Sequence, residues 1–271
     1  MNEKTQTGDK KVEDPKVIVS LTSFPAAIRY AVKAVDSLLK GSVLPDKIIL
    51  YLTFEQFGKE GVPHSLIKLS EENPIFEIRD YPRDIRSYRK LIPALNDFPD
   101  DIIVTVDDDV LYDRNMLSSL MDLHRKEPDA IIAQRAKRII PGKPYKKWKK
   151  FRWYHFLRKR IYRDPLIMQT GVAGVLYPPG SLKREMLDPE LFMKIAPTTD
   201  DIWFWAAAVA NGTSVIPVPF GYNKPKGLPK PKEITLKSFN FKTGDDNNLK
   251  AFNDILNAFP ELKRKIFDNF A

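Results

Sequence analysis

The feature that most restricts the fold of this chain is the run Asp-Ile-Ile-Val-Thr-Val at residues 101–106, which is followed by three aspartates. The run is rich in β-branched residues and does not alternate between apolar and polar positions. It therefore predicts a strand that is covered on both faces, as strands of parallel sheets are. The aspartates, Asp107, Asp108 and Asp109, would then lie at the carboxyl edge of the sheet, where open α/β sheets bind their ligands.

The segments around this strand alternate between strand and helix patterns. Apolar, β-rich runs occupy residues 17–21, 47–52 and 76–79, and residues 26–40 and 114–126 carry apolar side chains at helical spacing. A strand, helix, strand order predicts parallel pairing through right-handed crossovers. The expected fold class is therefore α/β, with a Rossmann-like, mostly parallel sheet, flanking helices, a basic insertion and a helical C-terminal tail.

The pattern changes after residue 129. Residues 130–133 and 214–220 predict strands, and residues 202–210 predict a helix. Residues 224–233 hold three prolines and four lysines, so we expect a loop there. The tail at 246–270 predicts two short helices that are separated by a proline.

The composition excludes several kinds of site. The 271 residues include no cysteine and only three histidines, which lie far apart. Disulfides, thiolate catalysis and zinc sites built from Cys or His are therefore not expected. No window approaches the length of apolar sequence that a transmembrane helix needs.

Three consecutive carboxylates at the end of a buried strand repel one another strongly unless a cation neutralises them. Oxygen ligands with no nearby His or Cys suit Mn²⁺ or Mg²⁺. Because alternate residues of an extended segment point the same way, Asp107 and Asp109 are the candidate metal ligands, and Asp108 faces elsewhere. The alternative is a solvated acidic turn that caps the following helix.

A second acidic pair, Asp200 and Asp201, follows Thr198 and Thr199 at the start of a predicted helix. A carboxylate placed within hydrogen-bond reach of an attacking hydroxyl can act as a general base. The alternative is structural, because threonine caps and acidic residues in the first turn both stabilise a helix start.

The formal net charge of +9 comes from one segment. Residues 135–163, called the basic segment below, contain 13 Lys and Arg, seven aromatic residues and no acid, and this leaves 31 basic against 35 acidic residues elsewhere. The composition suits docking on an anionic membrane surface, and it equally suits a groove for single-stranded nucleic acid. A solvated basic loop beside nucleotide phosphates is the third interpretation. Because the rest of the chain is mildly acidic, nucleic acid is not the expected partner.

An apolar parallel strand that delivers Asp-x-Asp to a sheet edge resembles the DXD motif of GT-A glycosyltransferases. In that family the motif holds a metal on the diphosphate of a nucleotide sugar. Further stretches resemble bacterial members that build capsule, lipopolysaccharide or other surface glycans. These stretches keep the family's order and cover residues 19–25, 45–50, 88–95 and 171–177.

The resemblance implies a GT-A fold and a metal-dependent transfer of a sugar from a nucleotide-diphosphate donor, a UDP sugar, to a glycan or lipid-linked acceptor. It also implies inversion at the anomeric carbon, with Asp201 as the base and Asp200 in reserve. The other implied roles are nucleobase and ribose contacts by Thr22, Ser23 and Arg29, a nucleotide contact by Lys90, Mn²⁺ or Mg²⁺ binding by Asp107 and Asp109, a ribose or sugar contact by Asp108, and lining of the donor-sugar and acceptor cleft by Gly171 and Gly174.

Two of these assignments have plain alternatives. Without the resemblance, a solvated lysine on a helix is the favoured interpretation of Lys90, because most charged side chains are solvated. Gly171 and Gly174 read equally as a tight turn.

The resemblance also implies a division of the chain. Residues 1–16 form a flexible leader, which is polar and has no apolar core of a secretory signal. Residues 17–222 form the catalytic domain, with a nucleotide-sugar half at 17–128 and an acceptor half at 129–222. Residues 223–271 form a Pro/Lys loop and a helical tail. A lipid-linked acceptor favours the membrane interpretation of the basic segment, which places the protein in the cytoplasm, peripheral on the inner face of the cell membrane.

Two other functions compete with this interpretation. A metal-dependent nucleotidyltransferase also uses paired acids at a sheet edge, but it needs a Gly-rich or strongly basic loop near the first strand, and residues 22–25 offer neither. A nucleic-acid- or lipid-binding protein that acts through the basic segment would show salt-sensitive affinity that survives loss of Asp107 and Asp109.

Overall fold

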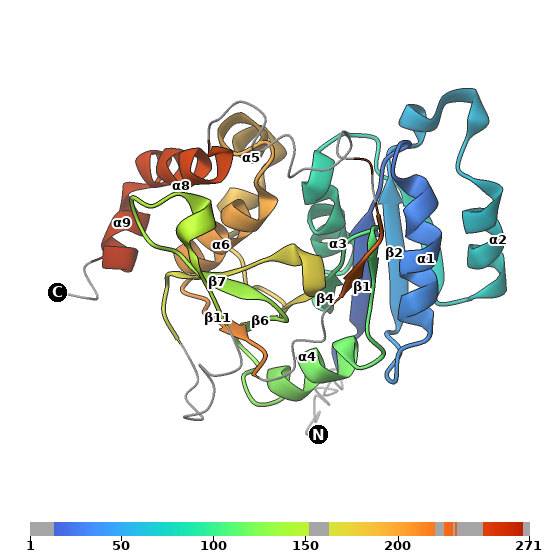
Figure 1. The fold of residues 1–271 in the computed structure, drawn as a ribbon, viewed down its shortest axis with the longest axis horizontal. Helices are drawn as coiled ribbons and strands as arrows, with labels where there is room; N and C mark the ends of the chain where they lie inside the picture. Colours follow the sequence, from blue (N-terminus) through green and yellow to red (C-terminus); the bar gives the residue numbers. More distant parts are fainter. Residues whose placement is uncertain (1–13, 152–162, 220–224, 230, 232–245, 268–271) are drawn as a thin grey trace, which may run out of the picture.

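The computed structural model describes residues 14–151, 163–219, 225–229, 231 and 246–267. The remaining parts of the predicted leader, basic segment, Pro/Lys loop and tail lie outside the described residues. A central sheet with helices packed on it forms the body of the molecule (Figure 1).

The central sheet has seven strands: β1 (Val17–Thr22), β2 (Lys47–Leu52), β3 (Phe76–Asp80), β4 (Ile102–Thr105), β6 (Ile131–Ala133), β10 (Val175–Tyr177) and β11 (Val215–Pro217). Their order is β11-β6-β10-β4-β1-β2-β3. The pairs β1·β2, β1·β4, β2·β3 and β6·β11 are parallel, which confirms the predicted mostly parallel sheet. β10 is inserted antiparallel between β4 and β6, a feature that the strand patterns did not predict.

β4, the strand before the three aspartates, is buried along its whole length, as predicted. Ile103 packs into the core on one face of the sheet, and Ile102 and Val104 pack into the core on the other. Its non-alternating sequence is explained by this double burial. The first core also receives α3 (Ile92–Asp97) and α6 (Asp200–Asn211), and the second receives α1 (Ile28–Leu39), α2 (His64–Glu72) and α4 (Met116–His124).

Residues 87–98, whose apolar side chains are spaced as in a helix, belong to two separate elements. Residues Arg86–Lys90 form a 3₁₀ turn, η2, and α3 begins at Ile92 with Pro93 in its first turn. A proline is tolerated there because the N–H groups of a first turn have no partner within the helix. The division places Arg89 and Lys90 on η2, next to β1 and β2.

The described part of the basic segment contains two short strands and a 3₁₀ turn. β7 (Ala136–Arg138) pairs antiparallel with β8 (Lys149–Lys150) and with β9 (Ile167–Gln169), and a 3₁₀ turn, η3 (Tyr145–Lys147), lies between β7 and β8. This three-stranded sheet was not predicted from the sequence. The strand β9, which pairs with β7, lies beyond the basic segment, so no local pattern predicts the pairing.

The predicted loop at residues 224–233 also contains a short strand, which corrects the expectation. β12 (Lys226–Gly227) pairs antiparallel with β5 (Val110–Leu111), directly after the three aspartates. The backbone N–H of Leu228 donates to the carbonyl oxygen of Asp109 over 2.7 Å. Part of the Pro/Lys loop is therefore anchored beside the acidic cluster.

The C-terminal helices are confirmed within the described residues. α8 (Asn247–Ala258) and α9 (Pro260–Phe267) pack on α6, and α5 (Pro189–Ile195) completes this group. Trp203 and Trp205 of α6 are fully buried here, so both serve the core. Among the described helices, none combines the length and apolarity required to cross a bilayer.

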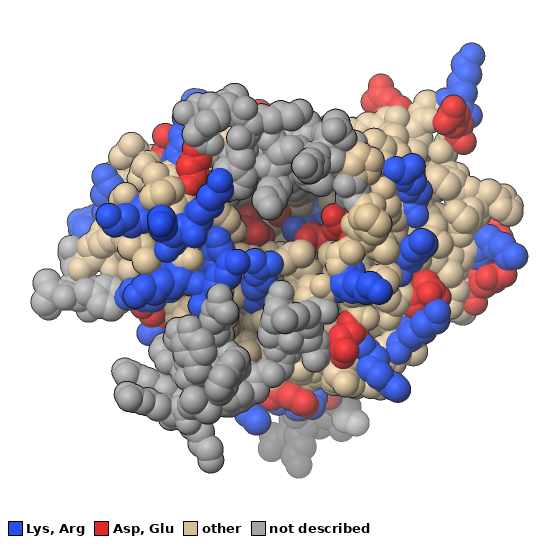
Figure 2. All heavy atoms as spheres, viewed as in Figure 1, with Lys and Arg blue, Asp and Glu red and all other residues tan. Residues whose placement is uncertain are grey.

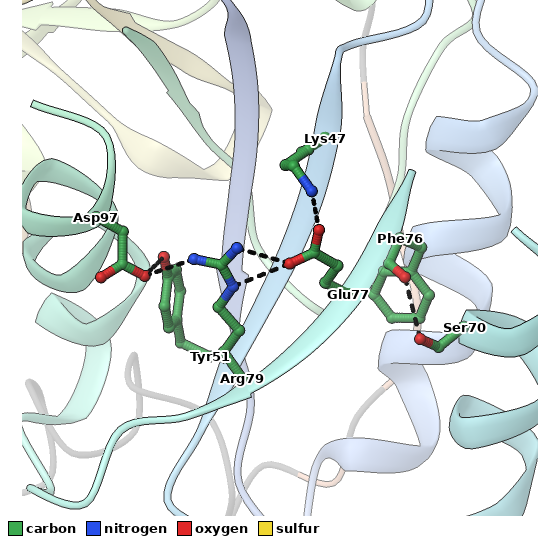
Figure 3. A network of polar contacts seen from close by, with 7 residues as sticks. All are labelled: Lys47, Tyr51, Ser70, Phe76, Glu77, Arg79 and Asp97. Atoms are coloured by element: carbon green, nitrogen blue, oxygen red, sulfur yellow. Dashed lines mark hydrogen bonds and ion pairs between the residues drawn. The ribbon is translucent and has the colours of Figure 1, made fainter. Parts of the chain in front are cut away.

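A polar network joins β2, β3 and α3 at the edge of the sheet that β3 forms (Figure 3). Glu77 contacts Lys47 and also accepts hydrogen bonds from Arg79, at 3.0 Å from Nε and 2.6 Å from Nη2. Arg79 continues to Asp97 at 2.8 Å, and the hydroxyl of Tyr51 donates to the same carboxylate at 2.8 Å. Burial alone would raise the pKa of Glu77, but Lys47 and Arg79 lower it below its usual value.

Glu77→Gln is expected to lower the free energy of unfolding by up to about 1 kcal/mol near neutral pH, because the network is partly exposed. A carboxylate whose pKa is lowered by folding stabilises the protein above its unfolded pKa and loses this effect as the pH falls through the folded pKa. The difference between variant and wild type should therefore disappear in acid. Urea unfolding of the wild type and the variant, near neutral pH and in acid, measures this difference in the free energy of unfolding. Glu72→Gln, at an exposed pair with Lys68, is the control with little expected effect.

Candidate active site

The three aspartates after β4 have different partners. Asp108 is buried and accepts a hydrogen bond from the hydroxyl of Ser23, in the loop after β1. Asp107 keeps 27% of its side chain exposed and contacts the ammonium of Lys90. The backbone N–H of Asp107 donates to the hydroxyl of Tyr112 at 2.7 Å. The prediction that Asp108 turns away from Asp107 agrees with these separate contacts.

Lys90 joins the two acidic groups that the sequence places far apart. Its Nζ lies 3.0 Å from Oδ1 of Asp107 and 3.1 Å from Oδ2 of Asp200. Only 8% of the side chain is exposed, so the interpretation as a solvated lysine is wrong. Burial opposes the charge, but the fields of Asp107 and Asp200 outweigh it and raise the pKa of Lys90 above its ordinary value.

Asp200 and Asp201 occupy the first turn of α6, where the positive end of the helix dipole favours carboxylates. Thr199 makes no side-chain capping bond. Asp200 is buried and accepts a 2.8 Å hydrogen bond from Ser87 in addition to its contact with Lys90. Asp201 is half-buried, and both of its carboxylate oxygens lie 3.1 Å from the backbone nitrogen of Gly171. Both acids therefore contact residues that lie far away in the sequence, and stabilisation of a helix start alone does not require such contacts.

The environment of Asp201 suits a general base. Burial raises the pKa of Asp201 to about 7, the charge of Asp200 adds to the increase, and Lys90 opposes it. A carboxyl group with this pKa can accept and release a proton near neutral pH. Because Asp200 is enclosed by Lys90 and Ser87, Asp201 is the more accessible of the two.

Gly171 and Gly174 meet different surroundings. A Cβ atom on Gly171 would lie 2.8 Å from Nζ of Lys90 and 3.1 Å from Oδ1 of Asp201. Gly174 has a φ of +102°, and its Cβ would lie 2.9 Å from the sulfur of Met116 on α4. Gly171 thus belongs to the acidic site, whereas the packing of Gly174 against α4 explains that glycine structurally.

Gly171→Ala is expected to lower turnover by about a hundredfold with little change in stability, because the new methyl group displaces Lys90 and Asp201. Gly174→Ala is expected to destabilise the protein by about 1–3 kcal/mol, because alanine rarely adopts a positive φ. Turnover of the folded protein and urea unfolding separate the two effects. The reverse pattern, with lost stability at residue 171 and lost turnover at 174, would contradict this account.

The predicted nucleotide contacts Thr22 and Ser23 are fixed by Arg89, which the sequence analysis did not single out. Arg89 is 2% exposed; it donates 2.8 Å hydrogen bonds to Oγ1 of Thr22 and to the carbonyl of Ser23, and it also contacts Thr53. The sequence signal that could have pointed to Arg89 was its position directly before Lys90, a predicted nucleotide contact. Arg29, by contrast, is exposed on α1, where it bonds the hydroxyl of Tyr30, and no contact joins it to this group.

One face of the molecule displays these groups as a charge pattern. Figure 2 shows a hollow with acidic side chains at its floor and Lys and Arg side chains gathered beside it, over the part of the molecule where Figure 1 places β7. Acidic and basic side chains therefore lie next to each other at this hollow.

The residues fit a divalent cation only in part. Asp107 and Asp109 supply two carboxylates, but the described part of the chain contains no group of three or more His, Cys, Asp or Glu placed to hold a metal ion. Lys90 contacts Oδ1 of the partly exposed Asp107. Two hard carboxylates suit Mg²⁺ or Mn²⁺ that completes its shell with water and substrate phosphate oxygens.

Comparison with known proteins agrees with this architecture. No family model matches the chain, and no curated protein matches its sequence. Among solved structures, the fold matches the mannosyltransferase PcManGT from Pyrobaculum calidifontis, which was solved with GDP-Man and Mn²⁺. The TM-score is 0.52 and the identity 15%, over 93% of this chain and 73% of the other. This chain shares the fold of that mannosyltransferase.

The fold places the acidic groups at the edge of the sheet where a ligand would bind. In an open α/β sheet the carboxyl edge is the ligand-binding edge, and here it carries Asp107, Asp108 and Asp109. The contacts of Lys90 and Gly171 bring Asp200 and Asp201 to the same place. Of the other predicted site residues, Gly174 joins this group through a 3.0 Å hydrogen bond from its N–H to the carbonyl of Gly171, whereas the guanidinium of Arg29 bonds to Tyr30.

Proposed function

We propose that the protein is a metal-dependent glycosyltransferase that moves a sugar from a nucleotide-diphosphate donor to a glycan or lipid-linked acceptor, with inversion. The observation that carries the proposal is the ion bridge of Lys90 between Asp107 and Asp200 at the carboxyl edge of a glycosyltransferase fold. It joins the acidic cluster after β4 to the acidic pair of α6 in one site. In this proposal residues 17–128 bind the nucleotide sugar and residues 129–222 bind the acceptor.

Asp201 is the proposed catalytic base. Its carboxylate takes the proton of the acceptor hydroxyl as the oxygen attacks the anomeric carbon, while the bond from that carbon to the diphosphate breaks. The backbone N–H of Gly171 holds the carboxylate in place. The pKa of about 7 leaves much of Asp201 ionised near neutral pH, so it can accept the proton.

The opposite side of the site is proposed to hold the donor. Arg89 fixes the loop that carries Thr22 and Ser23, and Ser23 in turn orients Asp108, so this loop is preorganised for ribose and base. A divalent ion bound by Asp107 and Asp109 would offset the charge that develops on the leaving diphosphate.

The finer parts of the proposal rest on the sequence resemblance. They are a UDP sugar as donor, Mn²⁺ or Mg²⁺ as the ion, a role in bacterial surface-polysaccharide synthesis, and a cytoplasmic location, peripheral on the inner face of the cell membrane. The solved mannosyltransferase holds GDP-Man and Mn²⁺, so GDP-mannose belongs beside the UDP sugars in any donor screen.

A donor screen tests the proposal. The full chain is incubated with UDP and GDP sugars in Mn²⁺ or Mg²⁺, and release of the nucleoside diphosphate is measured. Hydrolysis of one donor that depends on the metal and on Asp201 is the expected result. If no nucleotide sugar is hydrolysed or bound in either metal, the proposed function is wrong.

A further inference from the structure

Three cations lie together at the small sheet that β7, β8 and β9 form beside the candidate active site. Lys137 on β7 lies directly opposite Lys150 on β8. Arg135 immediately precedes β7, and its charge, like that of Lys150, acts on Lys137. Like charges that face each other across a strand pair are destabilising. This face therefore has an excess of positive charge.

The opposite face of β7 carries Arg138, and Lys149 of β8 lies across from it. Arg138 forms a 2.7 Å ion pair with Asp164. Within the described residues, no ion pair with a carboxylate is formed by Arg135, Lys137 or Lys150. Among these residues the buried Lys137 thus lacks the carboxylate at ion-pair distance that Arg138 has.

Lys137 is the most telling of the three, because only 4% of the residue is exposed. Its Nζ donates to the carbonyl oxygen of Tyr145 at 3.1 Å and lies 3.2 Å from the centre of the tyrosine ring. An ammonium has three donors, and a buried one ordinarily has an anionic partner. Burial lowers the pKa of Lys137 to about 8, the charges of Arg135 and Lys150 add to the decrease, and the carboxylates of Asp246 and Asp201 oppose it only in part.

The cationic face borders the proposed base. Ala136 pairs with Gln169, whose side-chain amide donates to the backbone carbonyl of Asp201 at 3.2 Å. The N–H of Thr170 donates to the carbonyl of Arg135 at 2.9 Å, and the next residue along the chain is Gly171, which holds the Asp201 carboxylate. In Figure 2 the Lys and Arg side chains border the acidic hollow on this side.

The described aromatic residues of the basic segment do not present a membrane-docking face. Trp148 is 2% exposed, its indole N–H donates to the carbonyl of Lys143, and its ring lies 5.9 Å from that of Phe252 on α8. Tyr145 and Phe151 also pack against the core. Rings turned into the protein cannot sit at the depth of lipid headgroups. The described cations therefore favour a ligand at the opening of the site over a bilayer surface.

We propose that Arg135, Lys137 and Lys150 bind an anionic group of the sugar acceptor, a phosphate or a carboxylate, and so place its hydroxyl at Asp201. The anionic group would supply the negative charge that the face lacks, and it would accept charge-assisted hydrogen bonds from these cations. The inference rests on the proposed glycosyltransferase function and specifies its acceptor as acidic.

Binding of matched sugars tests this site. The full chain, labelled with ¹³C-lysine, is titrated by NMR with glucose, glucuronate and glucose 6-phosphate at constant ionic strength. We expect at least one of the acids to bind about tenfold or more tightly than glucose and to shift the Lys137 signal. Lys137→Met and Lys150→Gln should each remove most of that preference. Lys33→Gln, at an exposed lysine of α1, should retain it.

Each other outcome overturns the inference. Equal affinity for glucose and both acids would do so, and so would an equal loss in Lys33→Gln, which would indicate a general charge effect. Vesicles of phosphatidylserine and of phosphatidylcholine form the second arm. Lys150-dependent binding to phosphatidylserine without binding of the soluble acids would assign the face to lipid. Nucleotide-sugar binding in the same samples separates the two proposals, because its presence without acid preference contradicts the acceptor site alone.

Discussion

Lys90→Met is expected to lower the free energy of unfolding by about 3–5 kcal/mol, because removal of one member of a buried ion bridge leaves uncompensated charge. Lys90 contacts Asp107 at 3.0 Å and Asp200 at 3.1 Å with only 8% of its side chain exposed. Methionine keeps the length of the side chain but leaves two carboxylates facing each other. Turnover should fall together with stability, because the same bridge aligns the acidic cluster of β4 with the pair on α6. Urea unfolding and donor turnover measure both effects.

Matched variants separate the bridge from a general effect of losing a lysine. Lys33→Met removes an exposed lysine from α1 and should leave stability and turnover unchanged. Ser87→Ala removes only the 2.8 Å hydrogen bond to Asp200 and should cost about 1 kcal/mol. If Lys90→Met were as stable and as active as the Lys33 variant, the bridge would not hold the site together.

Asp201→Asn is expected to reduce turnover by about 10²–10⁴-fold while donor affinity stays unchanged, because the amide cannot accept the proton of the acceptor. The wild-type rate should rise with pH and level off above about pH 7, the pKa to which burial and Asp200 raise Asp201. The sign follows from the role, since only the ionised carboxylate is a base. The residual rate of the variant should lack this dependence. Initial rates across the pH range, together with donor titrations, measure it.

Asp122→Asn is the control for this variant, because Asp122 is an exposed acid of α4 that pairs with Arg125. It should retain both the rate and the pH profile of the wild type. A fully active Asp201→Asn, or a variant whose rate still rises through about pH 7 as in the wild type, would show that another group is the base.

The parts of the fold that follow from local pattern were predictable from the sequence. The run before Asp107 is buried on both faces in β4, and the parallel pairing of β1, β2 and β4 follows from their alternation with helices. The antiparallel insertion of β10 was not predictable in this way, because a three-residue apolar strand carries no signal of its direction. The same limit applies to β12, where two residues pair within a proline-rich segment.

The candidate site shows a similar division. Asp107 was predicted because a carboxylate at the end of a buried strand is a local signal, whereas Asp201 was predicted from the resemblance to GT-A glycosyltransferases, because a helix start alone explains an aspartate. The bridge through Lys90 joins Asp107 and Asp200, which lie more than ninety positions apart, and the contacts of Arg89 with Thr22 and Ser23 span more than sixty. No spacing rule connects such residues. These contacts depend on the packing of η2 against β1, which the sequence does not reveal.

The most direct test of the central claim is a binding titration of a nucleotide-diphosphate sugar into wild type and Asp109→Asn, with and without Mn²⁺. The claim is that the acids after β4 hold a nucleotide sugar through a divalent ion at the carboxyl edge of the sheet. We predict that the wild type binds a UDP or GDP sugar tightly only in the presence of the metal, and that Asp109→Asn binds it about 10–100-fold more weakly. Absence of binding, or binding that depends on neither the metal nor Asp109, would contradict the account.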